Sequence, residues 1–163
     1  MPTDVLVAAE WIATIPGFSR EMTGERLPPD VLPSAPGKRI RPAPWLKTGF
    51  VTVQWAGGGN DPDVPRRNPV MQVDCWAALP GSNDPPWRMC EALGEAIWLA
   101  TRARTGFNRP LSIQAEGVTY PVAVVQGASL DTSFRRLYDD AADYAHTWAN
   151  LALSWVMPSL TIP

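Results

Sequence analysis

Residues 146–155 read HTWANLALSW, and this stretch decides between two architectures for the chain. Its larger apolar residues recur at every second position, which places on one face Ala149, Leu151, Leu153 and Trp155. A strand sends alternate side chains to opposite faces, whereas a helix needs apolar residues three and four positions apart. A helix over 141–155 is the rival, since alanine and leucine are good helix formers. The alternation, together with Thr147, Trp148 and Trp155, favours a strand.

Two earlier stretches, 50–55 and 70–77, alternate in the same way and predict two more half-buried strands. The segment 57–67 between them is rich in glycine and proline and is too long for a tight hairpin turn. We therefore expect an antiparallel pair with a protruding loop. Residues 112–115 and 118–126 also read as strands.

Two segments have helical spacing. Thr3 can cap a first helix with Asp4 in its first turn, and one face then carries Val5, Ala8, Ala9, Ile12 and Ile15. A second helix can be capped by Asn83 or Asp84 and is expected to stop at Gly106. Its apolar face is formed by Cys90, Leu93, Ile97 and Ala100. The sequence thus predicts an α+β fold, with two main helices on one face of an antiparallel sheet of about four to five strands.

A proline-rich segment, 18–48, separates the first helix from the first strand. Six of its residues are proline, so it cannot form an internal helix or a central strand. We expect an extended arm that a neighbouring subunit orders, or a strap around the domain. The 163 residues fit one domain spanning 1–163.

The composition favours a protein that binds other proteins. Only 18% of residues are charged and eight are tryptophan, a residue enriched at protein interfaces. The net charge of −2 argues against general nucleic-acid binding. The first residues lack the regions of a signal peptide, and no apolar run approaches about 18 residues, so a cytoplasmic protein is expected.

Residue types that carry chemistry are sparse. His146 is the sole histidine, no G-x-S-x-G motif accompanies it, and Cys75 and Cys90 fall where core residues belong. The glycines of 57–59 precede a strand, which argues against a phosphate-binding loop. The acidic group 139–143 is typical of a solvated turn. We therefore expect a structural protein that is not an enzyme and has no catalytic residue, cofactor or metal site.

An ordered string of motifs between Trp45 and Trp98 resembles the tail terminator proteins of long-tailed (siphovirus-type) bacteriophages of actinobacteria. It begins with GFVTV at 49–53 and continues with the glycine-rich loop containing Asp61-Pro62. VPRRNPV at 64–70, QVDCWA at 72–77 and SNDPPW at 82–87 follow. The opening helix and the acidic turn before the last strand are also similar. The features cover about two-thirds of the chain.

The resemblance implies a homohexameric ring at the head-proximal end of the tail tube. Such a ring ends tube polymerisation and docks to the head–tail connector, so the partners would be further copies, the tube protein and a connector or stopper protein. The genome would pass through the lumen without specific contacts. The protein would assemble in the host cytoplasm and reside in the virion, at the neck end of the tail.

Candidate interface residues follow from exposed aromatic side chains beside a loop with paired arginines. They are Arg66 and Arg67 in the loop and Tyr144, His146 and Trp148 on the outer face of the last strand. Ring contacts are head-to-tail and need two different patches on each subunit. The alternatives are another head–tail joining protein, such as a stopper or tail-completion factor, or a host adaptor that binds a peptide. A small hydrolase ranks last.

Overall fold

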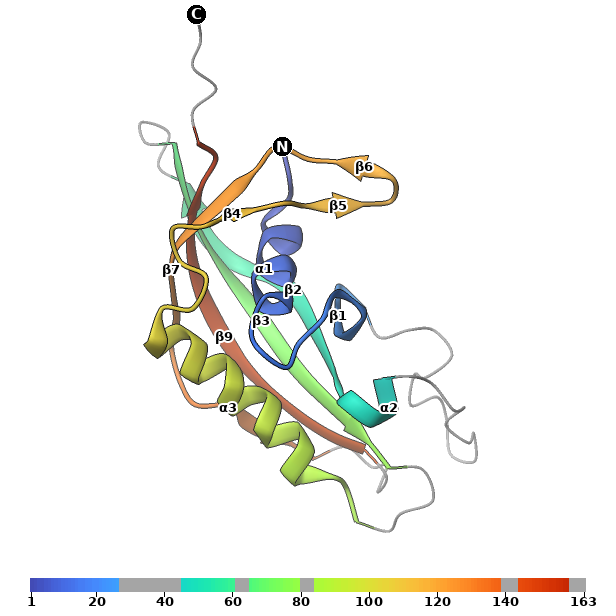
Figure 1. Cartoon of the computed structure of the whole chain (residues 1–163). Coiled ribbons are helices and arrows are strands. Elements are labelled where there is room, and N and C mark those ends of the chain that lie inside the picture. The colour runs from blue at the N-terminus through green and yellow to red at the C-terminus, as the bar shows by residue number, and fades with distance from the viewer. Residues whose placement is uncertain (27–44, 61–64, 80–83, 139–143, 159–163) are drawn as a thin grey trace, which may run out of the picture.

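The computed structural model describes residues 1–26, 45–60, 65–79, 84–138 and 144–158 (Figure 1). The elements in chain order are α1 (Asp4–Ala13), the 3₁₀ helix η1 (Arg20–Met22), β1 (Thr23–Gly24), α2 (Trp45–Thr48), β2 (Phe50–Asn60), β3 (Arg66–Ala78), α3 (Trp87–Ala103), β4 (Pro110–Leu111), β5 (Gln114–Ala115), β6 (Val118–Thr119), β7 (Ala123–Leu130), β8 (Arg135–Leu137) and β9 (Tyr144–Val156).

The main sheet has the strand order β1-β2-β3-β9-β7-β4, and β8 also pairs with β9 beyond the end of β7. The α+β class is confirmed, and the stretch that decided it forms β9, a strand at the centre of the sheet. The predicted count of four to five strands is too low, because the described residues contribute seven strands to this sheet. The additional strands β1, β4 and β8 are two or three residues long, too short to show an alternation.

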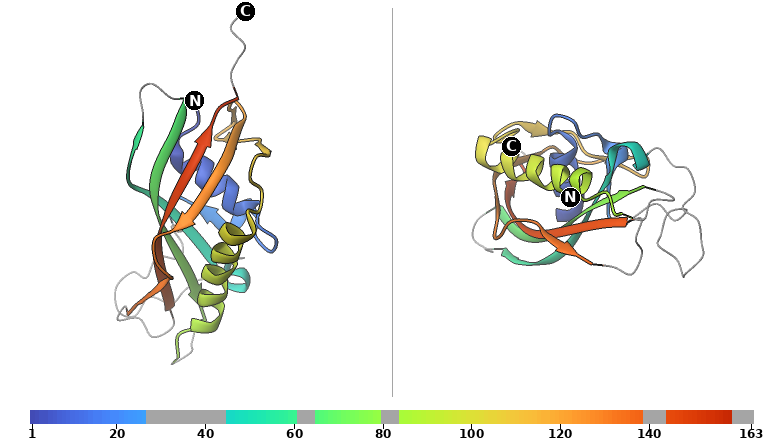
Figure 2. Two further views of the ribbon diagram at one scale, coloured as in Figure 1. Left: turned by 90° about the vertical axis from the view of Figure 1, so that its left-hand side faces the viewer. Right: turned by 90° about the horizontal axis from the view of Figure 1, so that it is seen from below.

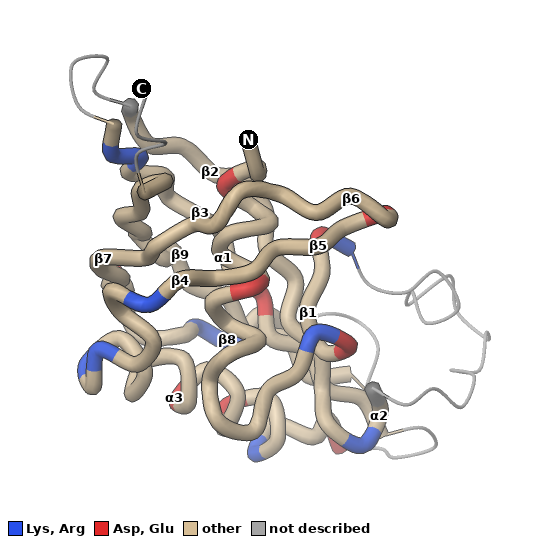
Figure 3. The backbone as a smooth tube through the Cα atoms, turned by 45° about the horizontal axis from the view of Figure 1, so that its top comes forward, with Lys and Arg blue, Asp and Glu red and all other residues tan. Residues whose placement is uncertain are grey.

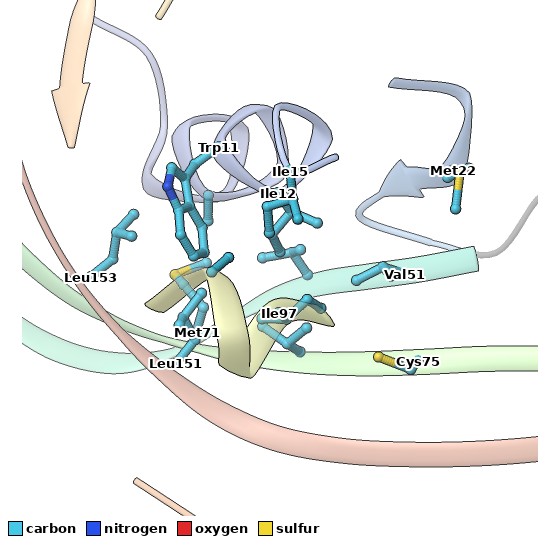
Figure 4. Close-up of a cluster of buried hydrophobic side chains, with 14 of the residues drawn as sticks. Trp11, Ile12, Ile15, Met22, Val51, Met71, Cys75, Ile97, Leu151 and Leu153 are labelled. Atoms are coloured by element: carbon cyan, nitrogen blue, oxygen red, sulfur yellow. The ribbon is translucent and has the colours of Figure 1, made fainter. Parts of the chain in front are cut away.

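Helices α1 and α3 both pack on the inner face of the sheet, which curls around them (Figure 2). Side chains from both helices meet the sheet in one core, in which Trp11 and Ile12 from α1 and Ile97 from α3 are fully buried beside Met71 and Leu151 (Figure 4). Thr3 caps α1 as predicted, because its Oγ1 accepts a hydrogen bond from the Leu6 amide.

The two helix faces differ in how well the sequence predicted them. In α1, Val7 and Trp11 are fully buried while Val5 and Ala9 are half-buried, so the buried face is rotated from the predicted one. In α3, all four predicted residues, Cys90, Leu93, Ile97 and Ala100, are buried. Neither predicted end of α3 is correct.

The N-cap of α3 is Pro86, which lies two positions beyond Asp84 and makes no side-chain capping bond. The helix ends at Ala103 because Arg104 adopts a left-handed conformation, φ 56°, and its amide bonds to the Ala100 carbonyl. Gly106 lies in the following turn and not at the helix end. Asn83, the other predicted cap, lies outside the described residues.

The predicted loop at 57–67 is largely strand. Gly57–Asn60 extend β2, Arg66 and Arg67 begin β3, and the two strands stay paired with a bulge between Trp55 and Gly57. Of the proline-rich segment 18–48, residues 27–44 lie outside the described part. The flanks form η1, α2 and β1, and β1 pairs in parallel with β2. No helix among the described residues has the length and apolar character needed to cross a bilayer.

Candidate assembly surfaces

Arg66 and Arg67 begin β3 and point to opposite faces of the sheet. Arg67 donates from Nε to Asp4 Oδ1 at 2.8 Å and from Nη2 to Asp4 Oδ2 at 2.7 Å. Trp155 donates from Nε1 to the same carboxylate at 2.9 Å, and the Arg67 guanidinium lies over the Trp155 ring. Arg67 therefore ties the start of β3 to the start of α1 within the subunit, whereas Arg66 is exposed.

The pKa values of Asp4 and Arg67 reflect both their burial and their hydrogen bonds. Desolvation alone would raise the pKa of the Asp4 carboxyl, but the hydrogen bonds from Arg67 and Trp155 outweigh it, so that this pKa is lowered from its ordinary value. The hydrogen bonds to Asp4 raise the pKa of Arg67. Both groups are charged at neutral pH. Because a fork-shaped guanidinium matches a carboxylate in two parallel bonds, the geometry suits a structural link.

His146 lies on the outer face of the sheet, the face away from α1 and α3. Its Nε2 is 2.6 Å from Asp74 Oδ1, and its ring stacks on Trp76 with centroids 3.7 Å apart. Trp76 is the residue directly opposite on β3. His146 is 7% exposed and Asp74 is 5% exposed, so this pair is buried. One ring nitrogen of the histidine is therefore paired with a carboxylate, and the side chain is buried where an exposed position was expected.

The neighbours of this pair continue a polar row across the outer face. Gln72 donates from Nε2 to both Asp74 oxygens, and Trp76 donates from Nε1 to Thr52 Oγ1 at 3.0 Å. Trp148 is half-buried, and the Arg135 guanidinium lies 5.9 Å from its ring centroid. We call Thr52, Gln72, Asp74, Trp76, His146 and Trp148 the outer-face cluster.

The expected juxtaposition of aromatic residues and arginines is wrong. Tyr144 is 5% exposed and pairs with Ala78, whereas Arg66 pairs with Val156 at the other end of β9. With about 3.3 Å per residue along a strand, Tyr144 and Arg66 lie roughly 40 Å apart, and the nearest members of the two groups, Trp148 and Arg67, lie roughly 23 Å apart. The structure therefore brings Tyr144, His146 and Trp148 to one strand end and Arg66 with Arg67 to the other.

Cys75 and Cys90 lie on the opposite face from His146, inside the core, as predicted. Cys90 Sγ donates to the Cys75 carbonyl at 3.0 Å and lies 3.4 Å from Thr147 Oγ1. Burial raises the pKa of Cys90 to about 11 and raises that of Cys75 well above its ordinary value. Thiols with raised pKa values are poor nucleophiles at neutral pH.

A groove runs between α3 and the segment that joins β7 to β8. It consists of two adjoining cavities of about 400 and 460 Å³ that share Glu91 and Glu95. Gly94 forms its floor, where an added Cβ would lie 2.8 Å from Phe134 Cγ. We call this the α3 groove, and its other lining residues are Trp87, Arg88, Ala92, Trp98, Ser133 and Arg136.

The α3 groove combines exposed aromatic side chains with charged ones. Trp98 is 42% exposed, and Tyr138, whose ring packs against Trp87, is 76% exposed. Glu91 forms an ion pair with Arg136 across the groove at 2.5 Å. This site was not predicted from the sequence. Its available signal was the spacing of Trp87, Glu91 and Trp98, which places them on one exposed side of the helix.

A further exposed aromatic residue lies toward the opposite edge of the sheet. Trp55 of β2 is 60% exposed, although its alternation with Val51 and Val53 predicts a half-buried position. Figure 3 shows the charged residues scattered between long uncharged stretches of the backbone. Within the described ranges, no three histidine, cysteine, aspartate or glutamate residues gather as a potential metal site.

The comparisons with known proteins do not assign the chain to a family: no family model matches it, and no curated protein matches its sequence.

Proposed function

We propose that the protein is a structural subunit that forms a ring, and that this ring is the terminator of a long bacteriophage tail. The carrying observation is a pair of unlike surfaces with exposed tryptophans, which lie toward opposite edges of one sheet. Trp55 marks one surface, and the rim of the α3 groove marks the other. A cyclic ring needs two different patches on each subunit, because the patch that donates a contact differs from the patch that receives it.

The identification as a tail terminator rests on the resemblance over Trp45 to Trp98. That stretch contains β2, β3 and most of α3, which together supply Trp55, four of the six residues of the outer-face cluster and one wall of the α3 groove. In this proposal the ring caps the head-proximal end of the tail tube, stops its growth and receives the connector. A homohexamer is the expected ring.

The test is the molar mass of the purified protein by light scattering, across a wide concentration range, alone, with purified tail tubes and with purified connectors. Rings of the expected size, or a monomer that assembles on tube ends, would support the proposal. A protein that binds purified connectors and ignores tubes would be a stopper or tail-completion factor. A monomer that ignores both would overturn the assembly role.

The α3 groove favours one second candidate, an adaptor that binds a peptide as a monomer. Its two cavities, of about 400 and 460 Å³, are large enough for roughly two or three side chains. Screening a random peptide library against the monomer would separate the two functions. An adaptor would select peptides whose binding is lost when Trp98 is replaced. A ring subunit would select no peptide once it is assembled, because the groove would already be occupied.

A further inference from the structure

In the part of the chain that the structure describes, β2 has no paired strand along most of one edge. β1 pairs with it at Val51 and Thr52 alone, and from Val53 to Asn60 no other described strand lies on that side. Residues 50–60 read FVTVQWAGGGN and contain no charged residue. Edge strands expose unpaired backbone groups, and proteins commonly protect them with lysines, prolines or a covering element. This edge has one bulge, after Trp55, and an exposed tryptophan.

The far side of the sheet has a second open edge. β4 pairs with β7 at Ala123 and Val124, and the Asn108 amide bonds to the Val125 carbonyl. From Gln126 to Leu130, no described strand pairs with the outer side of β7. Residues 123–130 read AVVQGASL and are also uncharged. Among the described residues, the sheet therefore has two unlike edges that no strand covers over these stretches.

The directions of the two edges suit each other. Each of the pairs β2–β3, β3–β9 and β9–β7 is antiparallel, so β2 and β7 run in opposite directions. A second copy placed beside the first in the same orientation would therefore set its β2 antiparallel to β7. That arrangement would extend the sheet with the same pattern of bonds that it has inside one subunit.

The side chains of the two edge strands also match in height along the sheet and in the face to which they point. Trp55, Met71, Leu151 and Leu130 form one row across the four strands. Met71 and Leu151 are fully buried beneath the helices, so the side chains of this row lie on the helix face. In a neighbouring copy at the same level, Trp55 would project on the helix face beside Leu130. The α3 groove opens on that face, and its residues Ser133 and Phe134 follow Leu130 by three and four positions.

We propose that the open edge of β2 in one copy pairs with the open edge of β7 in the next copy, and that Trp55 enters the α3 groove of that copy. This rests on the proposed ring and names its contact surfaces. The occupant of the groove is a second copy of this chain. The contact would bury an exposed tryptophan against Trp98 and Phe134, and the glycines of 57–59 would let the two backbones approach closely.

The closing experiment uses cysteines on the outer face, away from the groove. Gln54 and Ser129 are exposed, and in the proposed pairing they lie on adjacent strands within one or two residues of each other. The double variant Gln54→Cys/Ser129→Cys is treated with a short bifunctional maleimide at moderate concentration. The native thiols are fully buried and should not react. A ladder of dimers, trimers and larger species on a denaturing gel is expected, because each copy carries both halves of the contact.

Single variants make the result specific. Gln54→Cys or Ser129→Cys alone should remain monomeric on the same gel. A dimer from Gln54→Cys alone would mean that two β2 edges pair with each other, which would overturn the proposal. The absence of a ladder from the double variant would overturn it too.

Trp55→Lys provides a second measurement, with Val118→Lys as its control. Val118 is 50% exposed and lies in the β5–β6 hairpin, which forms a separate two-stranded sheet. Trp55→Lys should raise the concentration needed for assembly at least tenfold, and Val118→Lys should leave it unchanged. Equal effects of the two substitutions would exclude the groove as the site for Trp55.

The outcomes separate this inference from the proposed function. If the unmodified protein forms rings but the double-cysteine variant gives no ladder, the ring stands and the edge contact is wrong. If the protein ignores tail tubes yet the ladder forms, the edge contact stands and the terminator role is wrong.

Discussion

Asp4 and Arg67 lie 63 positions apart in the sequence, and their side chains form a two-bonded ion pair that joins α1 to β3. Trp155 of β9 donates to the same carboxylate. One acidic residue in the first turn of a helix therefore holds three elements together. Such a carboxylate is also favoured by the helix dipole.

Arg67→Ala should destabilise the protein by about 2–3 kcal/mol, since it leaves the Asp4 carboxylate buried with Trp155 alone. Arg66→Ala is the matched control: this neighbour is exposed, and its loss should change the free energy of unfolding by less than about 0.5 kcal/mol. Urea denaturation at neutral pH measures both. Equal losses would show that the ion pair contributes nothing specific.

The same carboxylate predicts a dependence on acid. Because the pKa of Asp4 is lowered in the folded protein, its contribution is present above the ordinary value of 3.8 and is lost as the pH falls through the lowered pKa. The unmodified protein should therefore lose more stability than Asp4→Asn between about pH 5 and pH 2. If the free energy of unfolding fell equally with pH in the two proteins, the prediction would be contradicted.

Gly49 and Gly117 form a matched pair for the cost of a side chain. Their φ angles are 77° and 76°, but a Cβ at Gly49 would lie 2.5 Å from Leu93 Cδ1 and 2.9 Å from the Trp76 carbonyl oxygen. At Gly117 nothing lies within 4 Å. Gly117→Ala should cost about 1–2 kcal/mol for backbone strain alone. Gly49→Ala should cost about 2 kcal/mol more because a backbone atom cannot move aside. Thermal unfolding of both variants gives the difference directly.

The Asp74–His146 pair should be energetically coupled. Replacing either residue with alanine leaves the other at 5–7% exposure, so each single substitution should cost about 2–3 kcal/mol. The double substitution should cost less than the sum by about 1–2 kcal/mol. Asp74 and Trp148 are cross-strand neighbours and provide a control cycle of similar geometry. Additive losses for Asp74 and His146 would mean that their 2.6 Å contact carries no free energy.

Cys90 predicts a loss of stability in alkali. Its pKa is raised by burial from 9.0 to about 11, so its contribution is complete below pH 9 and is lost as the pH rises toward 11. The expected loss over that range is on the order of 2 kcal/mol. Cys75 acts in the same direction. Cys90→Ala should be less stable at pH 7 but should show a shallower decline between pH 9 and 11. If the free energy of unfolding of Cys90→Ala fell as steeply with pH as that of the unmodified protein, a group other than Cys90 would be responsible for the loss.

Local patterns predicted the parts of the fold that depend on local information. β9 and the buried face of α3 were predicted correctly because their apolar residues recur with the period of a strand or a helix. The core positions of Cys75 and Cys90 follow from the same periodicity. The short strands β1, β4 and β8 were missed, because their pairing depends on neighbours that come from distant parts of the chain.

The candidate surfaces depend on tertiary contacts, and the sequence predicted them less well. Arg67 was expected in an exposed loop, but its partner Asp4 lies in another element. His146 was expected on an exposed face, and Asp74 and Trp76 from the adjacent strand bury it. The α3 groove forms where Phe134 crosses Gly94, a contact between residues 40 positions apart that no periodicity encodes.

The place of β9 in the sheet also determines when the protein can fold. β9 lies between β3 and β7, and it is synthesised after every strand that it pairs with. Until β9 has been synthesised, no strand joins β3 to β7. Met71 and Val125, which are buried in the folded protein, are then exposed to water. The sheet should therefore close late and cooperatively, since its central pairings join distant segments. Chains released early from the ribosome would lack the centre of the sheet, so only full-length chains would present the surfaces proposed for assembly.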